Sequence, residues 1–323
     1  MLQGHFSQDL NEVSPLLMES ETRVTRYKVN SSDGDSEHCL WSYIRIVIGV
    51  LITGWLTVTV IVGFPVLGYY LLGDPYKRGF FCDDESIRHP YKESTVTSRV
   101  LYFVGLGVPI ITMIITELLH SHLPTYNKKY FRLFGSRVPS WAWICYSNII
   151  VFGFGAASSQ LLTDIGKYLV GRLRPHFIDI CRPNVDCNLA ENRWRYIEDY
   201  QCTGTSAKKV HDSRLSFPSG HSSFAVYTMV YTVMYLQARM TWRGSYLLRH
   251  TIQFLCLAMA WFTALSRISD YKHHWSDVLA GSILGAVIAF LVARYVSELF
   301  REPVYMPREA VATEVEVEDK TSP

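Results

Sequence analysis

The sequence predicts an all-α fold: an integral membrane bundle of six transmembrane helices, with its functional site at the exoplasmic ends of the helices. Two observations favour this class. Of the 323 residues, 49% are hydrophobic and only 19% are charged, which is unusual for a soluble domain. The apolar residues also form stretches near the length of about 20 residues with which an α-helix crosses a bilayer core of ~30 Å.

The apolar stretches give six expected spans in chain order. They cover residues 46–67, 100–119, 141–162, 222–236, 247–265 and 278–296. The second contains Gly105, Gly107 and Pro109, which are tolerated inside a packed bundle. The third begins with Trp141 and Trp143, which are typical of a membrane interface. We therefore expect a membrane domain over residues 44–300, a disordered cytosolic tail at 1–43 and an acidic cytosolic tail at 301–323.

Basic residues in the short connections predict the orientation. The links between spans two and three and between spans four and five contain no acidic residue and carry Lys128, Lys129, Arg132, Arg137, Arg239 and Arg243. By the positive-inside rule both links face the cytosol, and both termini then face it too. The opposing loops, about residues 73–98 and 168–219, are expected at the exoplasmic face.

The remaining composition excludes several classes of function. The formal net charge is only +2, and no basic stripe or zinc-finger spacing is present, so we expect no nucleic-acid partner. The 7 cysteines are scattered rather than paired as CxxC, which argues against a zinc site. No carboxylate cluster suited to magnesium lies near the motifs described next. We expect neither a metal nor a cofactor.

Three polar motifs fall on one side of the membrane, whichever way the protein is oriented. KYLVGRLRP follows the third span, SFPSGHSS precedes the fourth, and SRISDYKHHWSD joins the fifth to the sixth. Because an even number of crossings separates them, their polar side chains gather at one surface. The candidate residues of this anion pocket are Lys167, Arg174, Ser219, Gly220, His221, Arg267, His273 and Asp277.

The first two motifs carry groups suited to an anion. Lys167 and Arg174 are seven residues apart, about two helical turns, so they are expected to share one face of a helix that Pro175 ends. The Pro-Ser-Gly turn opens the fourth span, where the free amides of Gly220 and His221 would face an anion. The structural alternatives are interfacial basic residues for the first motif and a helix-capping turn for the second.

The third motif contains two adjacent imidazoles and a carboxylate. If the sixth helix extends back to His273, then His273 and Asp277 lie four residues apart on one face, and the carboxylate can hold the imidazole. His274 is three residues from Asp277, so spacing alone does not choose between the two histidines. The alternative is an interfacial helix cap with ordinary snorkelling charges.

Taken together, the motifs favour phosphoryl transfer. That reaction needs positive groups and amides around the equatorial oxygens, an in-line nucleophile and an acid for the leaving oxygen. The first role falls to Lys167, Arg174, Ser219, Gly220 and Arg267. His273 would attack phosphorus, with Asp277 stabilising its imidazolium, and His221 would protonate the leaving alkoxide and then activate water.

The same motifs resemble the signature motifs of the type 2 phosphatidate phosphatase superfamily. The resemblance extends over about residues 41–300 and is closest to the animal lipid phosphate phosphatases, the branch that includes the Wunen proteins. It implies that His273 rather than His274 is the nucleophile and that His221 is the acid. It also implies a metal-independent phosphatase acting on phosphatidate, lysophosphatidate, sphingosine 1-phosphate and ceramide 1-phosphate at the exoplasmic or luminal face, and self-association into a homo-oligomer. The expected location is the plasma membrane, with an endomembrane pool.

The exoplasmic loops contain four cysteines, Cys82, Cys181, Cys187 and Cys202. In an oxidising compartment they could form one or two disulfides, with free thiols as the alternative and the pairing open. Two other functions also remain open: a catalytically silent lipid-binding or scaffold protein of the same fold, and an enzyme acting on a different phosphoester such as a sugar phosphate or a polyprenyl diphosphate.

Overall fold

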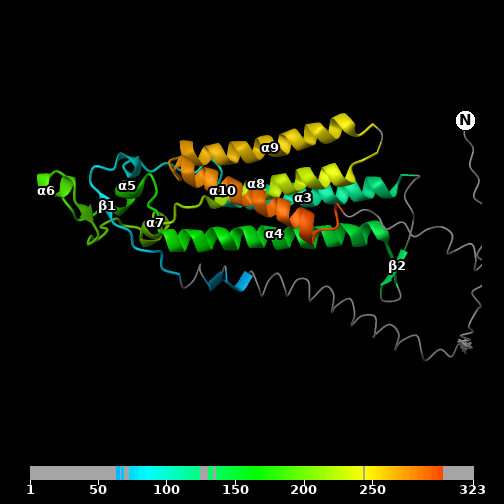
Figure 1. Cartoon of the computed structure of the whole chain (residues 1–323), viewed down its shortest axis with the longest axis horizontal. Helices are drawn as coiled ribbons and strands as arrows, with labels where there is room; N and C mark the ends of the chain where they lie inside the picture. Colours follow the sequence, from blue (N-terminus) through cyan, green and yellow to red (C-terminus); the bar gives the residue numbers. More distant parts are fainter. Residues whose placement is uncertain are drawn as a thin grey trace, which may run out of the picture.

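The structure, a computed structural model, describes residues 63–65, 67–68, 73–123, 130–133, 136–242 and 244–300. Within these ranges five long helices run side by side along the longest axis of the molecule (Figure 1). They are α3 (Ser98–Ser121), α4 (Ser140–Val170), α8 (Gly220–Arg239), α9 (Tyr246–Ser269) and α10 (Trp275–Leu291), the last continued by a π-helical turn, η3 (Val292–Val296). Nearly all of the first expected span, 46–67, and both tails lie outside the described residues.

Four of the described helices are long and apolar enough to cross a membrane, namely α3, α4, α9, and α10 together with η3. Their outer faces carry large exposed apolar side chains such as Phe103, Phe254 and Trp261, as lipid-facing helices should. The protein is therefore mostly helical with several membrane helices, which agrees with the predicted class. The count of six spans stays a prediction.

Helix α8 occupies the place of the fourth expected span but is more polar than its neighbours. It packs against α3, α4, α9 and α10, so it lies at the centre of the bundle and presents little surface to lipid. Thr228 and Thr232 are fully buried on it, and their hydroxyls donate to the carbonyls of Ala225 and Thr228. A helix enclosed by other helices needs no continuous apolar exterior, which explains its weaker apolar signal.

A buried ion pair joins α3 to α8 near the residues at which both helices end, Ser121 and Arg239. The Glu117 carboxylate is fully buried and accepts hydrogen bonds from Nε and Nη2 of Arg239 at 2.8 and 2.7 Å. The Tyr235 hydroxyl donates to the same carboxylate at 2.8 Å. A buried charge at this depth is tolerated because its partners satisfy it.

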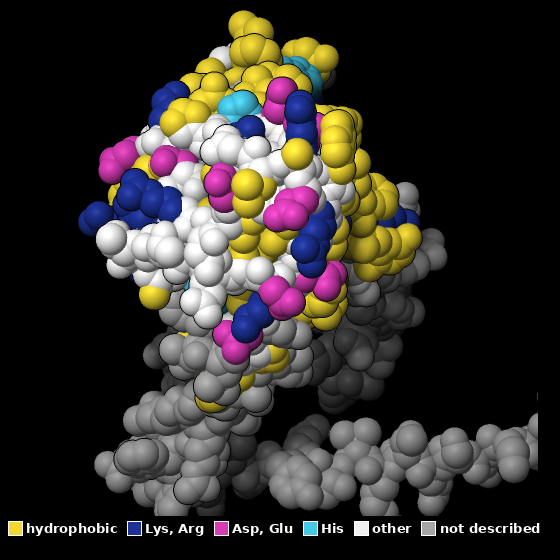
Figure 2. Space-filling view, turned by 90° about the vertical axis from the view of Figure 1, so that its left-hand side faces the viewer, with side chains coloured by type: hydrophobic (Ala, Val, Ile, Leu, Met, Phe, Trp, Pro, Cys, Tyr) yellow, Lys and Arg dark blue, Asp and Glu magenta, His cyan; other side chains and the backbone are white. Residues whose placement is uncertain are grey.

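The connections form a small layer at the opposite end of the bundle, labelled α5, α6, α7 and β1 in Figure 1. Its elements are β1 (Phe80–Phe81), η2 (Glu85–Ile87), α5 (Phe177–Cys181), α6 (Ala190–Arg193), β4 (Tyr196–Ile197) and α7 (Ala207–Asp212). Strands β1 and β4 pair antiparallel, with Phe80 opposite Ile197. The other two-stranded sheet, β2 (Tyr130–Leu133) with β3 (Ser136–Pro139), joins α3 to α4 at the far end. Seen end-on, basic and acidic side chains are interspersed over the loop layer (Figure 2).

Two disulfides hold the loop layer together. Cys82 pairs with Cys187, which joins the first loop to the long loop, and Cys181 pairs with Cys202 inside the long loop. The structure thus resolves the pairing that the sequence left open. Cys145 and Cys256, within the bundle, are free.

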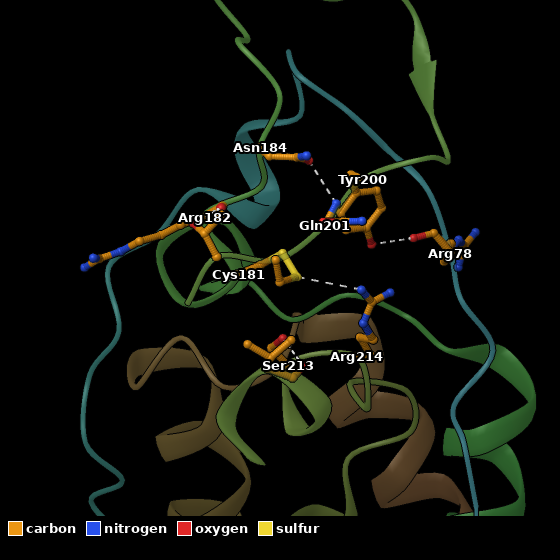
Figure 3. Close-up of a disulfide and its surroundings, with 11 residues drawn as sticks. Arg78, Cys181, Arg182, Asn184, Tyr200, Gln201, Ser213 and Arg214 are labelled. Atoms are coloured by element: carbon orange, nitrogen blue, oxygen red, sulfur yellow. Dashed lines mark hydrogen bonds between the residues drawn. A yellow bond between two sulfur atoms is a disulfide. The ribbon is translucent and has the colours of Figure 1, made fainter. Parts of the chain in front are cut away.

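Side chains around the second disulfide tie the loops further (Figure 3). Arg214 points toward it, with Nη2 3.8 Å from the Cys202 sulfur, and its guanidinium lies over the ring of Tyr200 at 5.2 Å. The Tyr200 hydroxyl donates to the Arg78 carbonyl at 2.9 Å. The first loop is therefore fixed to the long loop by a strand pair, a disulfide and side-chain contacts.

Candidate active site

A cavity of about 730 Å³ lies between the loop layer and the ends of the helices. Six of the eight predicted residues line it: Lys167, Arg174, Gly220, His221, Arg267 and His273. They come from three stretches of chain far apart in sequence, which the bundle brings together as the crossing argument predicted. Six Lys and Arg side chains and two carboxylates, those of Asp164 and Asp212, line the walls, so the cavity attracts anions.

The ring of His273 is fixed by the loop that precedes α8. Its Nδ1 donates to the carbonyl oxygen of Ser216 at 2.6 Å. A carbonyl only accepts, so the proton resides on Nδ1 and Nε2 keeps its lone pair. Burial, reinforced by the charge of Arg174, holds the pKa of His273 well below its usual value. The neutral ring can therefore act as a nucleophile near neutral pH.

Asp277 does not contact His273, and the predicted pairing of these two residues is wrong. Helix α10 begins only at Trp275, after His274 in an extended conformation with ψ 156° as its N-cap. His273 is thus outside the helix, and a spacing of four does not place it on one face with Asp277. The carboxylate instead accepts from the amide and Nδ1 of His274, both at 3.1 Å.

Asp277 does reach His273 indirectly, through Ser216. The Ser216 hydroxyl donates to the Asp277 carboxylate at 2.6 Å, and the Ser216 carbonyl holds the His273 ring. Arg172 completes the network, with Nη1 2.5 Å from the other carboxylate oxygen. Asp277 is fully buried and does not line the cavity, so the geometry makes it a positioning residue. The ring of His274, bonded to Asp277, does not line the cavity either.

His221 lies in the first turn of α8 with one ring nitrogen ready for a ligand. The ring lies near the backbone of Val96, and Nε2 is buried without a hydrogen-bond partner among the described residues. Nε of Arg174 is likewise buried and unpartnered there. Buried polar atoms are nearly always satisfied, so these two atoms in one cavity indicate where an anionic ligand makes its hydrogen bonds.

Lys167 and Arg174 meet in the cavity, but not on one helical face as predicted. Helix α4 ends at Val170, because Gly171 takes the left-handed conformation with φ 56°, where a Cβ would lie 2.1 Å from the Tyr76 carbonyl oxygen. Gly171, rather than Pro175, therefore ends the helix. Arg174 is placed by the long loop instead, since its amide donates to the Ser213 carbonyl at 2.8 Å.

The turn before α8 works mainly as a helix cap. Ser219 is the N-cap of α8 and its hydroxyl accepts from the Ser222 amide at 3.4 Å. Its side chain is fully buried and is not part of the cavity wall, so its contact with an anion stays a prediction. Gly220 does line the cavity, and a Cβ there would lie 3.0 Å from Nζ of Lys167. The lysine ammonium therefore lies against the amino end of α8, and both can serve one anion.

Comparison with known proteins places this site in a family. Residues 148–301 match the family model described as the PAP2 superfamily. The Drosophila melanogaster protein named "Putative phosphatidate phosphatase" is 51% identical over 257 residues, which cover 76% of this chain and 68% of that protein. This chain belongs to the PAP2 superfamily. Phospholipid phosphatase 1 of Rattus norvegicus is 44% identical over 230 residues, covering 70% of this chain and 78% of that protein, which matches the animal lipid phosphate phosphatase branch.

One solved structure is also similar, the transmembrane PAP2 type phosphatidylglycerolphosphate phosphatase of Bacillus subtilis. It is 16% identical, with a TM-score of 0.34 over 83% of this chain and 98% of that chain. At this level the likeness adds nothing to the family assignment.

Asp270 is a further residue of this PAP2 superfamily site, and it was not predicted from the sequence. This carboxylate is fully buried and accepts from Nη2 of Arg267 at 3.0 Å. It also accepts from the amide and hydroxyl of Thr95 at 2.7 and 2.8 Å. Asp270 therefore orients the Arg267 guanidinium and fastens the segment before α3 over the cavity. The sequence signal that could have revealed this partner of Arg267 is the position of Asp270 three residues after it, because such residues lie on the same face of a helix.

Lys272 was missed as well. It lines the cavity next to His273, and its Nζ lies 3.8 Å from the ring centroid of Tyr91. Burial, together with the charge of Arg174, lowers the pKa of Lys272 to about 8. This PAP2 superfamily member thus adds a cation to the cavity whose charge changes within an accessible pH range.

Proposed function

We propose that this protein is a lipid phosphate phosphatase that hydrolyses phosphatidate, lysophosphatidate, sphingosine 1-phosphate and ceramide 1-phosphate without a metal ion. The observation that carries the proposal is a nucleophilic lone pair and unpartnered buried nitrogens in one cavity. His273 lines a basic cavity with Nε2 available, and unpartnered nitrogens of His221 and Arg174 belong to the same cavity. Membership of a family of phosphatases supports the reaction type.

In the first step, Nε2 of His273 attacks phosphorus and forms a phosphohistidine, while the bond from phosphorus to the leaving oxygen breaks. His221, which binds the anionic substrate as an imidazolium, gives a proton to that oxygen and becomes neutral, so the leaving group departs as an alcohol. Lys167, Arg174 and Arg267, with the amide of Gly220, stabilise the equatorial oxygens. Asp277 acts through Ser216, which keeps the His273 ring aligned.

In the second step His221 takes a proton from water, and the hydroxide attacks the phosphohistidine. The bond between nitrogen and phosphorus breaks, which restores the neutral ring of His273 and releases inorganic phosphate. Cations provide the charge stabilisation that a metal provides in other phosphatases.

The loop layer supports an exoplasmic or luminal position for the site. Both disulfides lie in the layer that covers the cavity, and disulfides persist in oxidising compartments. We therefore assign the cavity to the exoplasmic side, with both termini cytosolic and the protein in the plasma membrane and an endomembrane pool. Chemical labelling of an added loop cysteine in sealed cells tests the orientation, and labelling only after permeabilisation contradicts it for the plasma membrane pool.

The test of the reaction is phosphate release by the purified full-length protein from a panel of the four lipids in detergent micelles, with a chelator present. Brief incubation with substrate labelled in the phosphate should yield an acid-labile, alkali-stable phosphoprotein. His273→Ala should abolish both signals, whereas His274→Ala, the matched control, should keep the phosphoprotein. A phosphoprotein in the His273 variant would refute the assigned nucleophile. Lipid binding without phosphate release would favour the silent lipid-binding alternative.

A further inference from the structure

An apolar groove of about 380 Å³ lies beside the active-site cavity, between α3, α8 and α9. Its walls include Val104, Gly105, Met229, Met259, Ala260 and Phe262. The hydroxyl-bearing residues among its lining, Thr228 and Thr263, are the polar exceptions in a wall of apolar side chains. The groove therefore offers a ligand almost no hydrogen bonds and fits a hydrocarbon.

The groove adjoins the active-site cavity at Leu101. Leu101, in the first turn of α3, lines both hollows. Val96 lines the groove, and its backbone lies near the His221 ring. The groove thus begins on the side of the cavity where His221 lies.

That position has a chemical meaning in the proposed reaction. In an in-line displacement the leaving oxygen is opposite the nucleophile and next to the general acid. With His273 as nucleophile and His221 as acid, the organic part of the substrate departs from phosphorus on the side of His221. The path from that oxygen leads past Leu101 into the groove.

Small residues create the space in the groove. Gly105 is buried against α8, and a Cβ there would lie 2.7 Å from the ring of Phe224. Ala225 and Ala260 are both buried in the walls. Two groove-lining residues of α9, Leu255 and Phe262, are themselves exposed, so the groove opens to the outer surface of the bundle. A chain in the groove therefore passes from the site to the lipid-facing exterior without crossing a polar layer.

We propose that this groove binds the hydrocarbon chain of the substrate while its phosphate occupies the cavity. The proposal rests on the proposed function and extends it, since it makes chain length a determinant of specificity. A long-chain phosphomonoester gains affinity from the groove, whereas a headgroup without a chain uses only the cavity.

Val104→Trp tests this directly, because it adds bulk on the groove side of α3. Phe103→Trp is the matched control, since Phe103 is the adjacent residue and is 82% exposed outside the groove. For a long-chain lysophosphatidate, Val104→Trp should lower kcat/KM by about tenfold, the effect of losing burial of roughly two methylene groups. Hydrolysis of glycerol phosphate and of a very short-chain ester should not change. Phe103→Trp should leave all three substrates unaffected.

Met259→Trp fills the groove from α9 and repeats the test should Val104→Trp fail to fold. A non-hydrolysable long-chain phosphonate supplies a second readout that needs no turnover: both groove variants should weaken its binding about tenfold. If the unmodified protein releases phosphate but Val104→Trp and Phe103→Trp have equal effects on kcat/KM, the groove assignment is overturned. The proposed function then remains intact. No phosphate release from any ester would overturn the proposed function, and phosphonate binding would then still decide the groove.

Discussion

Ser216 holds the imidazole of His273 through its backbone carbonyl, which lies 2.6 Å from Nδ1. Substitution of the Ser216 side chain does not remove this hydrogen bond directly, because its acceptor is a backbone carbonyl. The bond depends on where the loop lies, and the loop is held by the Ser216 hydroxyl on Asp277. Substitutions at Asp277 should therefore alter the alignment of the nucleophile without removing it.

We expect Asp277→Asn to lower kcat by about tenfold to a hundredfold, the range for losing a hydrogen bond to a charged group, with little change in KM. The cations that bind phosphate remain in place, so the loss should be smaller than for His273→Ala. Asp186→Asn is the control, because that carboxylate caps an exposed loop turn. Steady-state kinetics on one lipid check the prediction, and equal rates for the two asparagine variants would contradict it.

Asp270→Asn should raise KM by about tenfold, because Arg267 loses the charged partner that orients it. Thr95→Val separates this effect from the fastening of the loop, since it removes the hydroxyl contact with Asp270 and leaves the arginine contact. Its effect on KM should be smaller. An equal rise in KM for both variants would mean that the loop, rather than the arginine, is what Asp270 positions.

The pH dependence of KM should report Lys272, whose pKa is lowered to about 8. Below that pH the ammonium is charged and contributes to phosphate binding; above it the charge is lost, so KM should rise as the pH increases through about 8. Lys272→Met should have a higher KM at neutral pH and lack the rise. Measurements above neutral pH avoid the titration of the substrate phosphate, whose second pKa is near 6. A rise that persists in the variant would assign it to another group.

Cys82→Ser and Cys187→Ser should each lower stability by about 2–4 kcal/mol, as expected for loss of a disulfide. The double variant should be no less stable than either single variant, because one bond accounts for both losses. Thermal unfolding in detergent measures this, and Cys145→Ala, at a free thiol, is the control. Additive losses would show that the two cysteines act separately.

Much of the bundle could be predicted because membrane helices are encoded by long apolar stretches. The convergence of Arg174, His221 and His273 also followed from the sequence, since counting crossings needs only the number of spans between motifs. The ends of the helices were harder to predict. Gly171 and His274 end or begin helices through backbone conformation, which overrides a spacing of four or seven residues.

Contacts made by the backbone or by distant loops were not predictable from spacing. The partner of His273 is a carbonyl oxygen, and every residue carries one, so no residue type marks it. Asp270 bonds to Thr95 across a separation of 175 residues, and such a pair has no local pattern. The disulfide pairing had the same difficulty, because four cysteines allow three pairings.

The bond between Cys82 and Cys187 joins positions 105 residues apart, with α3 and α4 between them. With the loops on the exoplasmic side, as proposed, Cys82 is translocated well before its partner, and two helices must enter the bilayer before the bond can form. Cys181 and Cys202, only 21 residues apart, can be oxidised as soon as their own loop has been made. Maturation of the enzyme should thus depend on the order of translocation. An early bond of Cys82 to a wrong cysteine would leave the first loop without its covalent link to the long loop.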